Sequence, residues 1–180
     1  KNKLEAQQIY FFNQTFLDKW ETHSILSAHP ELASHMPQTV KFDRAKALVT
    51  MLSQHPVVFL KPVHGSLGRG IYKIRRLAAG YEVAHSTLSG ELVRQFSGTK
   101  SLIVYLSKRI RRPYVIQEGI DLLQDEGRPI DFRILMQKNS KGQWSVTSLV
   151  ARIGGENRIV SNVSRGGEIA SVLATLRRCN

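Results

Sequence analysis

The residues best suited to chemistry lie in a glycine-rich segment that contains Lys61, Gly65, Ser66, Gly68 and Gly70. Glycine tolerates positive φ and lets the backbone approach a ligand closely, so successive amide hydrogens of this segment can converge on an anion. Lys61 follows the apolar run 57–60, and Pro62, which lacks an amide hydrogen, is expected to end regular strand pairing directly after it. An ammonium group at a strand end, beside such a turn, would bind phosphate.

The spacing of the glycines matches neither of the two best-known phosphate-binding loops. The P-loop needs Gly-x4-Gly-Lys-Ser/Thr and the dinucleotide fingerprint needs Gly-x-Gly-x-x-Gly, each at the start of a helix. Here the order is Gly-x-x-Gly-x-Gly, and a second strand is predicted to follow. A strand-loop-strand flap over phosphates is similar to the way kinases hold nucleotides. An ordinary hairpin with a mobile glycine turn explains the glycines equally well, and the Lys-Pro pair at the entrance favours phosphate.

A second polar cluster follows the apolar strand predicted at residues 114–118. It contains Gln117, Glu118 and Asp121, with a glycine between the two acids. Backbone groups at such a strand end could read the edge of a base, and a carboxylate could bind ribose hydroxyls. An edge-strand acid with a structural role is the alternative reading.

Two more clusters lie near the end of the chain. Asp131 and Arg133 start a predicted strand and share one face, because side chains in a strand repeat every two residues. Arg152 and Asn162 each stand a few residues before paired glycines. Arginine in this setting suits bidentate recognition of phosphate or carboxylate. Taken singly, these clusters also fit a surface ion pair and a glycine turn.

Hydrophobic periodicity predicts the elements that position these residues. Helices are predicted at residues 18–27, 42–55, 91–96 and 101–110. Strands are predicted at residues 57–61, 71–74, 114–118, 131–137 and 144–153, the last two joined by a turn at 139–142. Hairpins outnumber parallel crossovers in this order, so the expected class is α+β with antiparallel sheets and flanking helices.

Composition narrows the classes of partner. The chain has 180 residues, of which 42% are hydrophobic, with a net charge of +12 and a single cysteine, Cys179. One cysteine excludes an intrachain disulfide and favours a reducing compartment, and the absence of a long apolar run or leader segment predicts a cytoplasmic protein without a membrane partner. The charge calls for an anionic partner. Basic residues are not interleaved with aromatic ones, so nucleic acid is not expected as a partner. The basic patch at residues 100–112 leaves the binding of an anionic polymer open as a further possible function.

The order of these motifs resembles that of the ATP-grasp superfamily and, within it, of the endospore coat-associated YheC/YheD family. The motifs are Lys-Pro with Gly-Ser-x-Gly-x-Gly, then Val-Ile-Gln-Glu, Asp-Phe-Arg, Ala-Arg and Asn-x-x-x-Gly-Gly. The match also includes residues 12–13 and 19–22, and so covers most of the chain. The combination is specific, whereas any single motif would be weak. The resemblance implies an ATP-grasp-like fold of two small lobes with a nucleotide cleft between them.

The resemblance also implies roles for individual residues. Lys19 and Lys61 would reach the phosphates of ATP, the glycine loop would close over them, and residues 115–118 would form the hinge that contacts adenine. Asp121 is the nearest candidate for the ribose. Arg133, Arg152 and Asn162 would surround the γ-phosphate and the acceptor. The family's usual reaction joins a carboxylate to an amine through an acylphosphate; the acceptors here are unknown, and a non-enzymatic coat or scaffold protein, with spore coat proteins as partners, is the alternative.

The sequence departs from the family pattern in its metal ligands. The pattern continues with an acid and a Glu-x-Asn motif that holds magnesium, and no such motif follows Glu168. Magnesium is therefore expected from the resemblance without ligands in this chain. Three segments are expected: an N-terminal helical part at residues 1–55, a subdomain with the glycine loop at 56–112, and a second subdomain at 113–180 that belongs to a longer protein.

Overall fold

The computed structural model describes residues 6–8, 16–43, 45–87, 91–155 and 167–179. The chain divides into two compact units, Lys1–Met36 and Pro37–Asn180. The first unit contains the helices α2 (Lys19–Ser27) and α3 (Pro30–Ala33). Asp18 begins α2 with a capping box, since its Oδ1 accepts hydrogen bonds from the amides of Trp20 and Glu21 at 2.8 Å each. The predicted helix at 18–27 is confirmed.

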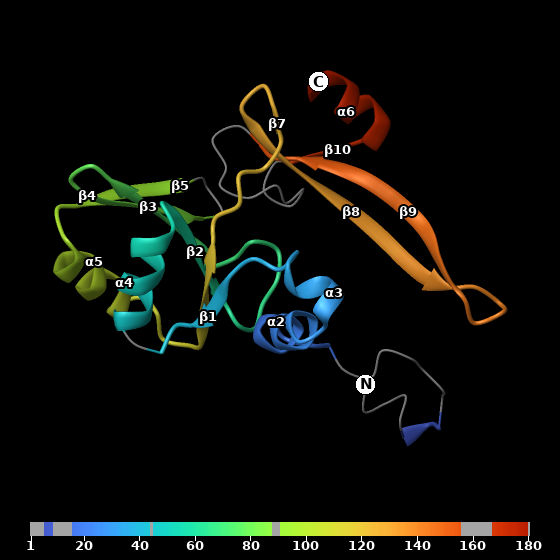
Figure 1. The fold of residues 1–180 in the computed structure, drawn as a ribbon, viewed down its shortest axis with the longest axis horizontal. Helices are drawn as coiled ribbons and strands as arrows, with labels where there is room; N and C mark the ends of the chain where they lie inside the picture. Colours follow the sequence, from blue (N-terminus) through green and yellow to red (C-terminus); the bar gives the residue numbers. More distant parts are fainter. Residues whose placement is uncertain (1–5, 9–15, 44, 88–90, 156–166, 180) are drawn as a thin grey trace. The chain divides into compact units, whose positions relative to one another are not determined.

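A six-stranded antiparallel sheet organises the first part of the second unit. Its strand order is β1-β6-β2-β3-β4-β5 (Figure 1). The strands are β1 (Thr39–Lys41), β2 (Val57–Pro62), β3 (Tyr72–Leu77), β4 (Gly80–Ser86), β5 (Glu91–Phe96) and β6 (Tyr114–Glu118). Strand β2 lies between β3 and β6, so the loop that follows it starts at the middle of the sheet.

Two helices, α4 (Ala45–Gln54) and α5 (Thr99–Ser107), pack on one face of this sheet (Figure 1). The main core forms there from Leu48, Met51, Leu52, Val58, Leu60, Tyr72, Ile74, Val83, Leu102, Leu106, Tyr114 and Ile116. In β2 the alternation is strict: Val58 and Leu60 are fully buried in the core, and Phe59 and Lys61 therefore lie on the opposite face. The core fixes which side chains of β2 can meet a ligand.

The segment 91–96 is a strand, so its prediction as a helix is wrong. It pairs with β4 in register from Tyr81 opposite Phe96 to Ser86 opposite Glu91. Six residues are too few for an isolated helix to be stable, and an available neighbour strand decides the outcome. The strand β4 itself was not predicted. The helices predicted at 42–55 and 101–110 are confirmed with shifted ends, as α4 and α5.

The second sheet has the order β10-β9-β8-β7. Its strands are β7 (Gln124–Asp125), β8 (Arg128–Lys138), β9 (Trp144–Ile153) and β10 (Glu168–Ala170), followed by helix α6 (Val172–Cys179). The predicted turn at 139–142 joins β8 to β9, with Asn139 Oδ1 accepting from the amides of Lys141 and Gln143 at 2.9 and 3.0 Å. A β-bulge interrupts the β8–β9 ladder. Leu135 pairs with Ser148 and Met136 with Val146, so Thr147 is an extra residue in β9.

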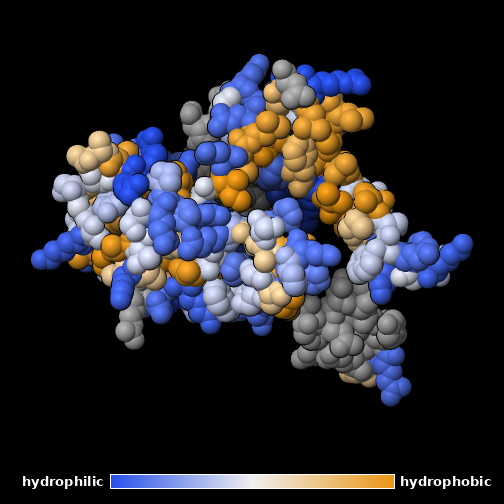
Figure 2. Space-filling view, in the orientation of Figure 1, coloured by the Kyte–Doolittle hydropathy of each residue, from blue (hydrophilic) through white to orange (hydrophobic). Residues whose placement is uncertain are grey.

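The β8–β9 ladder has one polar and one apolar face. Asp131, Arg133 and Arg152 share the polar face. The apolar face is partly covered at one end, where Ile130, Ala151 and Ile153 form a small core with residues of α6. Its exposed hydrophobic side chains are those of Phe132, Ile134, Met136, Trp144, Val146 and Leu149. Figure 2 shows hydrophobic side chains over this hairpin and over α6.

One buried acid ties α6 to the edge of the second sheet. Asp125 is 7% exposed, and its carboxylate accepts hydrogen bonds from Arg178 Nε and Nη2 at 3.3 and 2.9 Å. Arg128 Nη2 lies 3.4 Å from the same carboxylate. The hydrogen bond and charge of Asp125 raise the pKa of the Arg178 guanidinium. The helix is thus held by a charged contact as well as by the small core.

Candidate functional site

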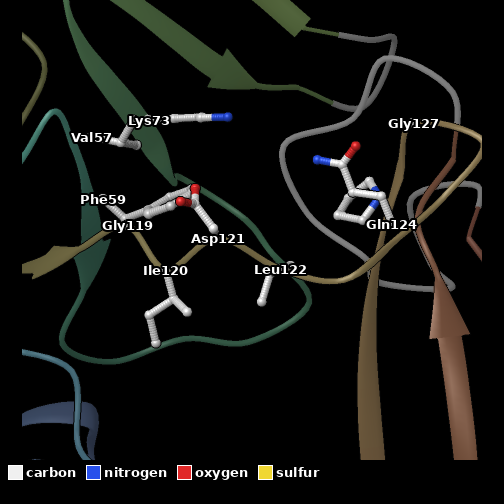
Figure 3. Close-up of a pocket in the computed structure, with 10 residues that line it drawn as sticks. Val57, Phe59, Lys73, Gly119, Ile120, Asp121, Leu122, Gln124 and Gly127 are labelled. Carbon is white, nitrogen blue, oxygen red and sulfur yellow. The ribbon is translucent and has the colours of Figure 1, made fainter. Parts of the chain in front are cut away.

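A cavity of about 200 Å³ lies on the face of the first sheet opposite the core (Figure 3). Its walls come from β2 and β3, from the connection between β6 and β7, from β7 with the turn that follows it, and from the start of β8. The lining residues are Val57, Phe59, Lys73, Gly119, Ile120, Asp121, Leu122, Gln124, Gly127 and Pro129. The cavity is therefore lined by strands of both sheets and by the connection between them.

The polar groups of the cavity come from opposite sides. Figure 3 shows the Lys73 ammonium group and the Asp121 carboxylate reaching into the same space, Lys73 from β3 and Asp121 from the connection. Phe59 and Val57 form the wall between them. An aromatic and aliphatic wall with one donor and one acceptor is typical of small-ligand sites.

A row of hydrogen-bonded side chains continues this face of the sheet. Lys61 Nζ donates to Gln117 Oε1, and the Gln117 amide in turn donates to Thr39 Oγ1 at 2.9 Å. The Lys61 ammonium also lies 5.3 Å from the centre of the Phe59 ring. Lys61 and Gln117, two predicted nucleotide-binding residues, are thus brought together on the cavity side of the sheet.

Lys61 lies one residue before the end of its strand. Pairing of β2 with β3 stops at Leu60 opposite Tyr72, as the lack of an amide hydrogen in Pro62 predicts. Pairing with β6 continues to Pro62 opposite Tyr114. Pairing was expected to end directly after Lys61; it ends one residue earlier on the β3 side and one residue later on the β6 side.

Glu118 points away from the cavity. It pairs with Val58, on the face that carries the core, whereas Gln117 pairs with Phe59. Its carboxylate accepts a hydrogen bond from the Gln38 amide at 2.9 Å and lies 3.2 Å from His55 Nδ1. The Glu118 side chain holds the end of α4, and only its backbone could contribute to the nucleotide site predicted there.

Gly119 brings the connection into close contact with β2. Its amide donates to the Val57 carbonyl at 2.8 Å. A Cβ at this position would lie 2.7 Å from Val57 Cγ1 and 3.1 Å from the Val57 carbonyl oxygen. The absence of a side chain therefore allows this approach, which places residues 120–122 beside the cavity.

The glycine loop has the backbone conformation that its sequence predicts. Gly65, Gly68 and Gly70 have φ values of 124°, 67° and 70°. The end of the loop is anchored, because the Tyr114 hydroxyl donates to the Gly70 carbonyl at 2.9 Å. A Cβ on Gly70 would also meet the Arg112 guanidinium at 2.9 Å.

On the second sheet, Arg152 forms a bidentate pair with Asp131. Arg152 Nε and Nη2 donate to the two carboxylate oxygens at 2.7 and 2.9 Å. Arg133 is exposed on the same face, as its two-residue spacing from Asp131 predicts. Pro129 lines the cavity and also belongs to this alternation, so the polar face of β8 continues from the cavity.

Two predicted site residues cannot be placed beside the cavity. Asn162 lies outside the described residues. Lys19 is the first residue of α2, in the other compact unit. Their assignment to the γ-phosphate and to the phosphates stays a prediction.

Sequence reasoning missed Lys73 and Phe59. The signal that could have found Lys73 is the alternation of β3, in which Tyr72 and Ile74 are buried and Lys73 faces the other side. Its position opposite Phe59 depends on the register between the strands, which the sequence alone does not give.

Magnesium is the metal ion that the resemblance to ATP-grasp proteins implies. Among the described residues, no group of three or more His, Cys, Asp or Glu side chains could hold a metal ion. Both oxygens of Asp131, the acid on the polar face, accept hydrogen bonds from Arg152. These described residues do not fit a magnesium ion.

Comparison with known proteins decides the family. The sequence model of the YheC/D-like ATP-grasp family matches residues 8–180. The chain belongs to this family. Its α+β fold with two antiparallel sheets agrees with the ATP-grasp-like fold that the motifs predict.

Two relatives come from Bacillus subtilis (strain 168). The endospore coat-associated protein YheD is 31% identical over 174 residues, which are 96% of this chain and 38% of YheD. The endospore coat-associated protein YheC is 25% identical over 158 residues, which are 88% of this chain and 44% of YheC. The chain thus spans less than half the length of either relative. No solved structure matches. No helix in the described part of the chain is long and apolar enough to cross a membrane.

Proposed function

We propose that this chain binds ATP, with the nucleoside in the cavity and the phosphates toward Lys61 and the glycine loop. The observation that carries the proposal is the continuity of one face. The cavity, Phe59 and Lys61 lie along the same side of β2, and the glycine loop follows that strand. Asp121 would accept from the ribose hydroxyls, and Gly65, Ser66, Gly68 and Gly70 would enclose the phosphates with their amides.

We further propose that the intact protein uses ATP to join a carboxylate to an amine. A carboxylate oxygen attacks the γ-phosphorus and the bond to the β,γ-bridging oxygen breaks, which releases ADP. The amine then attacks the acyl carbon of the acylphosphate, phosphate leaves, and the amine loses a proton to solvent or a base. Arg133, Arg152 and Asn162 would stabilise the charge that develops on the transferred group. Asp131 orients Arg152 for this role, because its bidentate contact fixes the guanidinium plane.

A second function, a non-enzymatic coat protein that retains the fold, is favoured by the names of the two relatives. In that case the chain would bind ATP weakly or not at all and would act with spore coat proteins. Turnover of ATP to ADP would distinguish the ligase from the coat protein. ATP binding must be measured first, because turnover requires it.

Calorimetric titration of the chain with ATP, with and without magnesium, tests the proposal. The Lys61→Met variant should bind ATP at least tenfold more weakly, since it loses a charge-assisted contact. Its melting temperature should stay within about 2 °C of the wild type, because the Lys61 side chain lies off the core. Lys46→Met, an exposed lysine of α4 on the other side of the sheet, is the matched control and should bind normally.

The outcomes discriminate clearly. No ATP binding by the wild type would refute the ATP-binding proposal and favour the coat-protein function. Normal binding by Lys61→Met would remove Lys61 from the site. Equal loss in Lys61→Met and Lys46→Met would indicate a general effect of charge and not a specific phosphate contact.

A further inference from the structure

Lys73 is the positive group of the cavity, and nothing in the sequence motifs assigns it a role. Its neighbours on the same face have partners. Lys61 donates to Gln117, and Arg75 forms an ion pair with Glu82 at 2.9 Å. Within the described part of the chain, the Lys73 side chain makes no ion pair or hydrogen bond. An ammonium group that reaches into a cavity without a partner is free to donate to a ligand.

The register places Lys73 away from the phosphate end of the site. Lys73 pairs with Phe59, and Phe59 pairs with Gln117, so the three form one row across β3, β2 and β6. Lys61 belongs to the next row on this face, toward the glycine loop, about 7 Å further along the strand. Lys73 lines the cavity together with Val57 and the connection 119–122, which lie on the side of this row that faces away from the glycine loop.

The size and chemistry of the cavity fit one part of a nucleotide. Its volume of about 200 Å³ is below the roughly 300–1,000 Å³ of sites that enclose a whole small molecule. The Phe59 ring offers a flat wall against which a heterocycle can stack. Lys73 supplies hydrogen-bond donors only, so its partner must be an acceptor. A purine ring carries such acceptors at its ring nitrogens.

We propose that Lys73 recognises the nucleoside end of the ligand, by donating a hydrogen bond from its ammonium group to a ring nitrogen of the purine base. This inference rests on the proposed binding of ATP and adds a residue that would determine selectivity for the base. Lys61 and Lys73 then divide the ligand between them. Lys61 acts on the phosphates, and Lys73 acts on the base.

The test compares Lys73→Met with Lys61→Met on ATP, ADP, AMP and adenosine, with competition titrations for the weaker ligands. Lys73→Met should weaken all four ligands by the same factor, about tenfold or more. Lys61→Met should weaken ATP far more than adenosine. Arg75→Met is the matched control, because Arg75 lies two residues further on the same strand face and does not line the cavity. It should bind all four ligands as the wild type does.

A second arm identifies the atom. Of 1-deaza-, 3-deaza- and 7-deaza-ATP, one should bind the wild type about tenfold more weakly than ATP does, and that difference should vanish in Lys73→Met. If none of the three behaves in this way, a ring nitrogen is not the partner of Lys73. The melting temperature of each variant, measured without ligand, checks that it is folded.

The remaining outcomes are distinct. If the loss in Lys73→Met shrinks from ATP to adenosine, Lys73 contacts the phosphates and the inference is wrong. If Lys73→Met binds ATP normally while the wild type binds ATP, the inference fails and the proposed function stands. If the wild type binds no nucleotide, both fail together.

Discussion

Substitution of Gly119 by alanine tests whether the connection beside the cavity is as tightly packed as the structure indicates. The added Cβ would lie 2.7 Å from Val57 Cγ1, 2.8 Å from Val57 Cβ and 3.1 Å from the Val57 carbonyl oxygen. Carbon atoms in favourable contact are about 3.5–4.0 Å apart, so the connection or β2 must shift by roughly 1 Å. The hydrogen bond from the Gly119 amide to Val57 lies in the path of that shift.

The expected cost is that of overpacking, about 1–3 kcal/mol. At roughly 2–4 °C per kcal/mol for a chain of this size, a cost of about 2 kcal/mol lowers the melting temperature by about 4–8 °C. Differential scanning fluorimetry without ligand measures this change. Because Val57 also lines the cavity, the variant should bind ATP more weakly as well.

Gly98→Ala is the matched control for this variant. A Cβ at Gly98 would have no atom within 4 Å, and its φ of −166° is extended backbone that any residue adopts. As Gly98 is the N-cap of α5, the exchange should cost less than about 1 kcal/mol. If Gly119→Ala melts no lower than Gly98→Ala, the contact with Val57 is loose and the reasoning about the connection is wrong.

Three further predictions concern the two sheets. Burial and, to a lesser extent, neighbouring tyrosines raise the pKa of Tyr72, so the folded state binds this proton more tightly than the unfolded state does, and stability is lost as the pH rises above about 10. Between pH 8 and pH 11 the melting temperature should therefore fall less in Tyr72→Phe than in the wild type. Parallel curves for the two proteins would contradict this. Asp125→Asn should lower the melting temperature by several degrees, because the guanidinium groups of Arg128 and Arg178 lose their counter-charge. Higher salt should reduce the difference in melting temperature between the variant and the wild type. A difference that does not change with salt would indicate an effect of packing. Anilinonaphthalene sulfonate, a dye that binds exposed apolar surface, should fluoresce less with Ile134→Lys, on the exposed apolar face, than with Leu135→Lys, on the polar face. Equal reductions by the two variants would mean that the dye binds elsewhere.

Local signals in the sequence predict much of this fold. The glycine segment, the strand before it and the hairpin at 131–153 follow from residue types and turn residues close together in the chain. The segment 91–96 was misassigned because its pairing with β4, and not its own composition, decides its structure. Propensity is a weak guide for so short a segment.

The candidate site was predictable where it depends on residue type and not where it depends on register. Lys61 and Gln117 follow from their motifs, and the structure brings them together. Lys73 needed the pairing of β3 with β2. The alternation within β6 predicts that Gln117 and Glu118 face opposite sides of the sheet. Only the structure shows that Glu118 faces the side of α4 and Gln117 the side of the cavity.

The β-bulge in the second sheet determines where the β8–β9 hairpin can change length. A residue deleted from β8 between Asp131 and Leu135 would shift every later side chain to the other face, which would mix the polar and apolar sets. Thr147 is different, because it is the extra residue opposite the step from Leu135 to Met136. When Thr147 is deleted, Ser148 follows Val146 directly. These two side chains already lie on opposite faces, so the ladder becomes regular without moving any side chain to the other face. A deletion scan of the hairpin should therefore find position 147 tolerant and positions 132–134 intolerant of shortening.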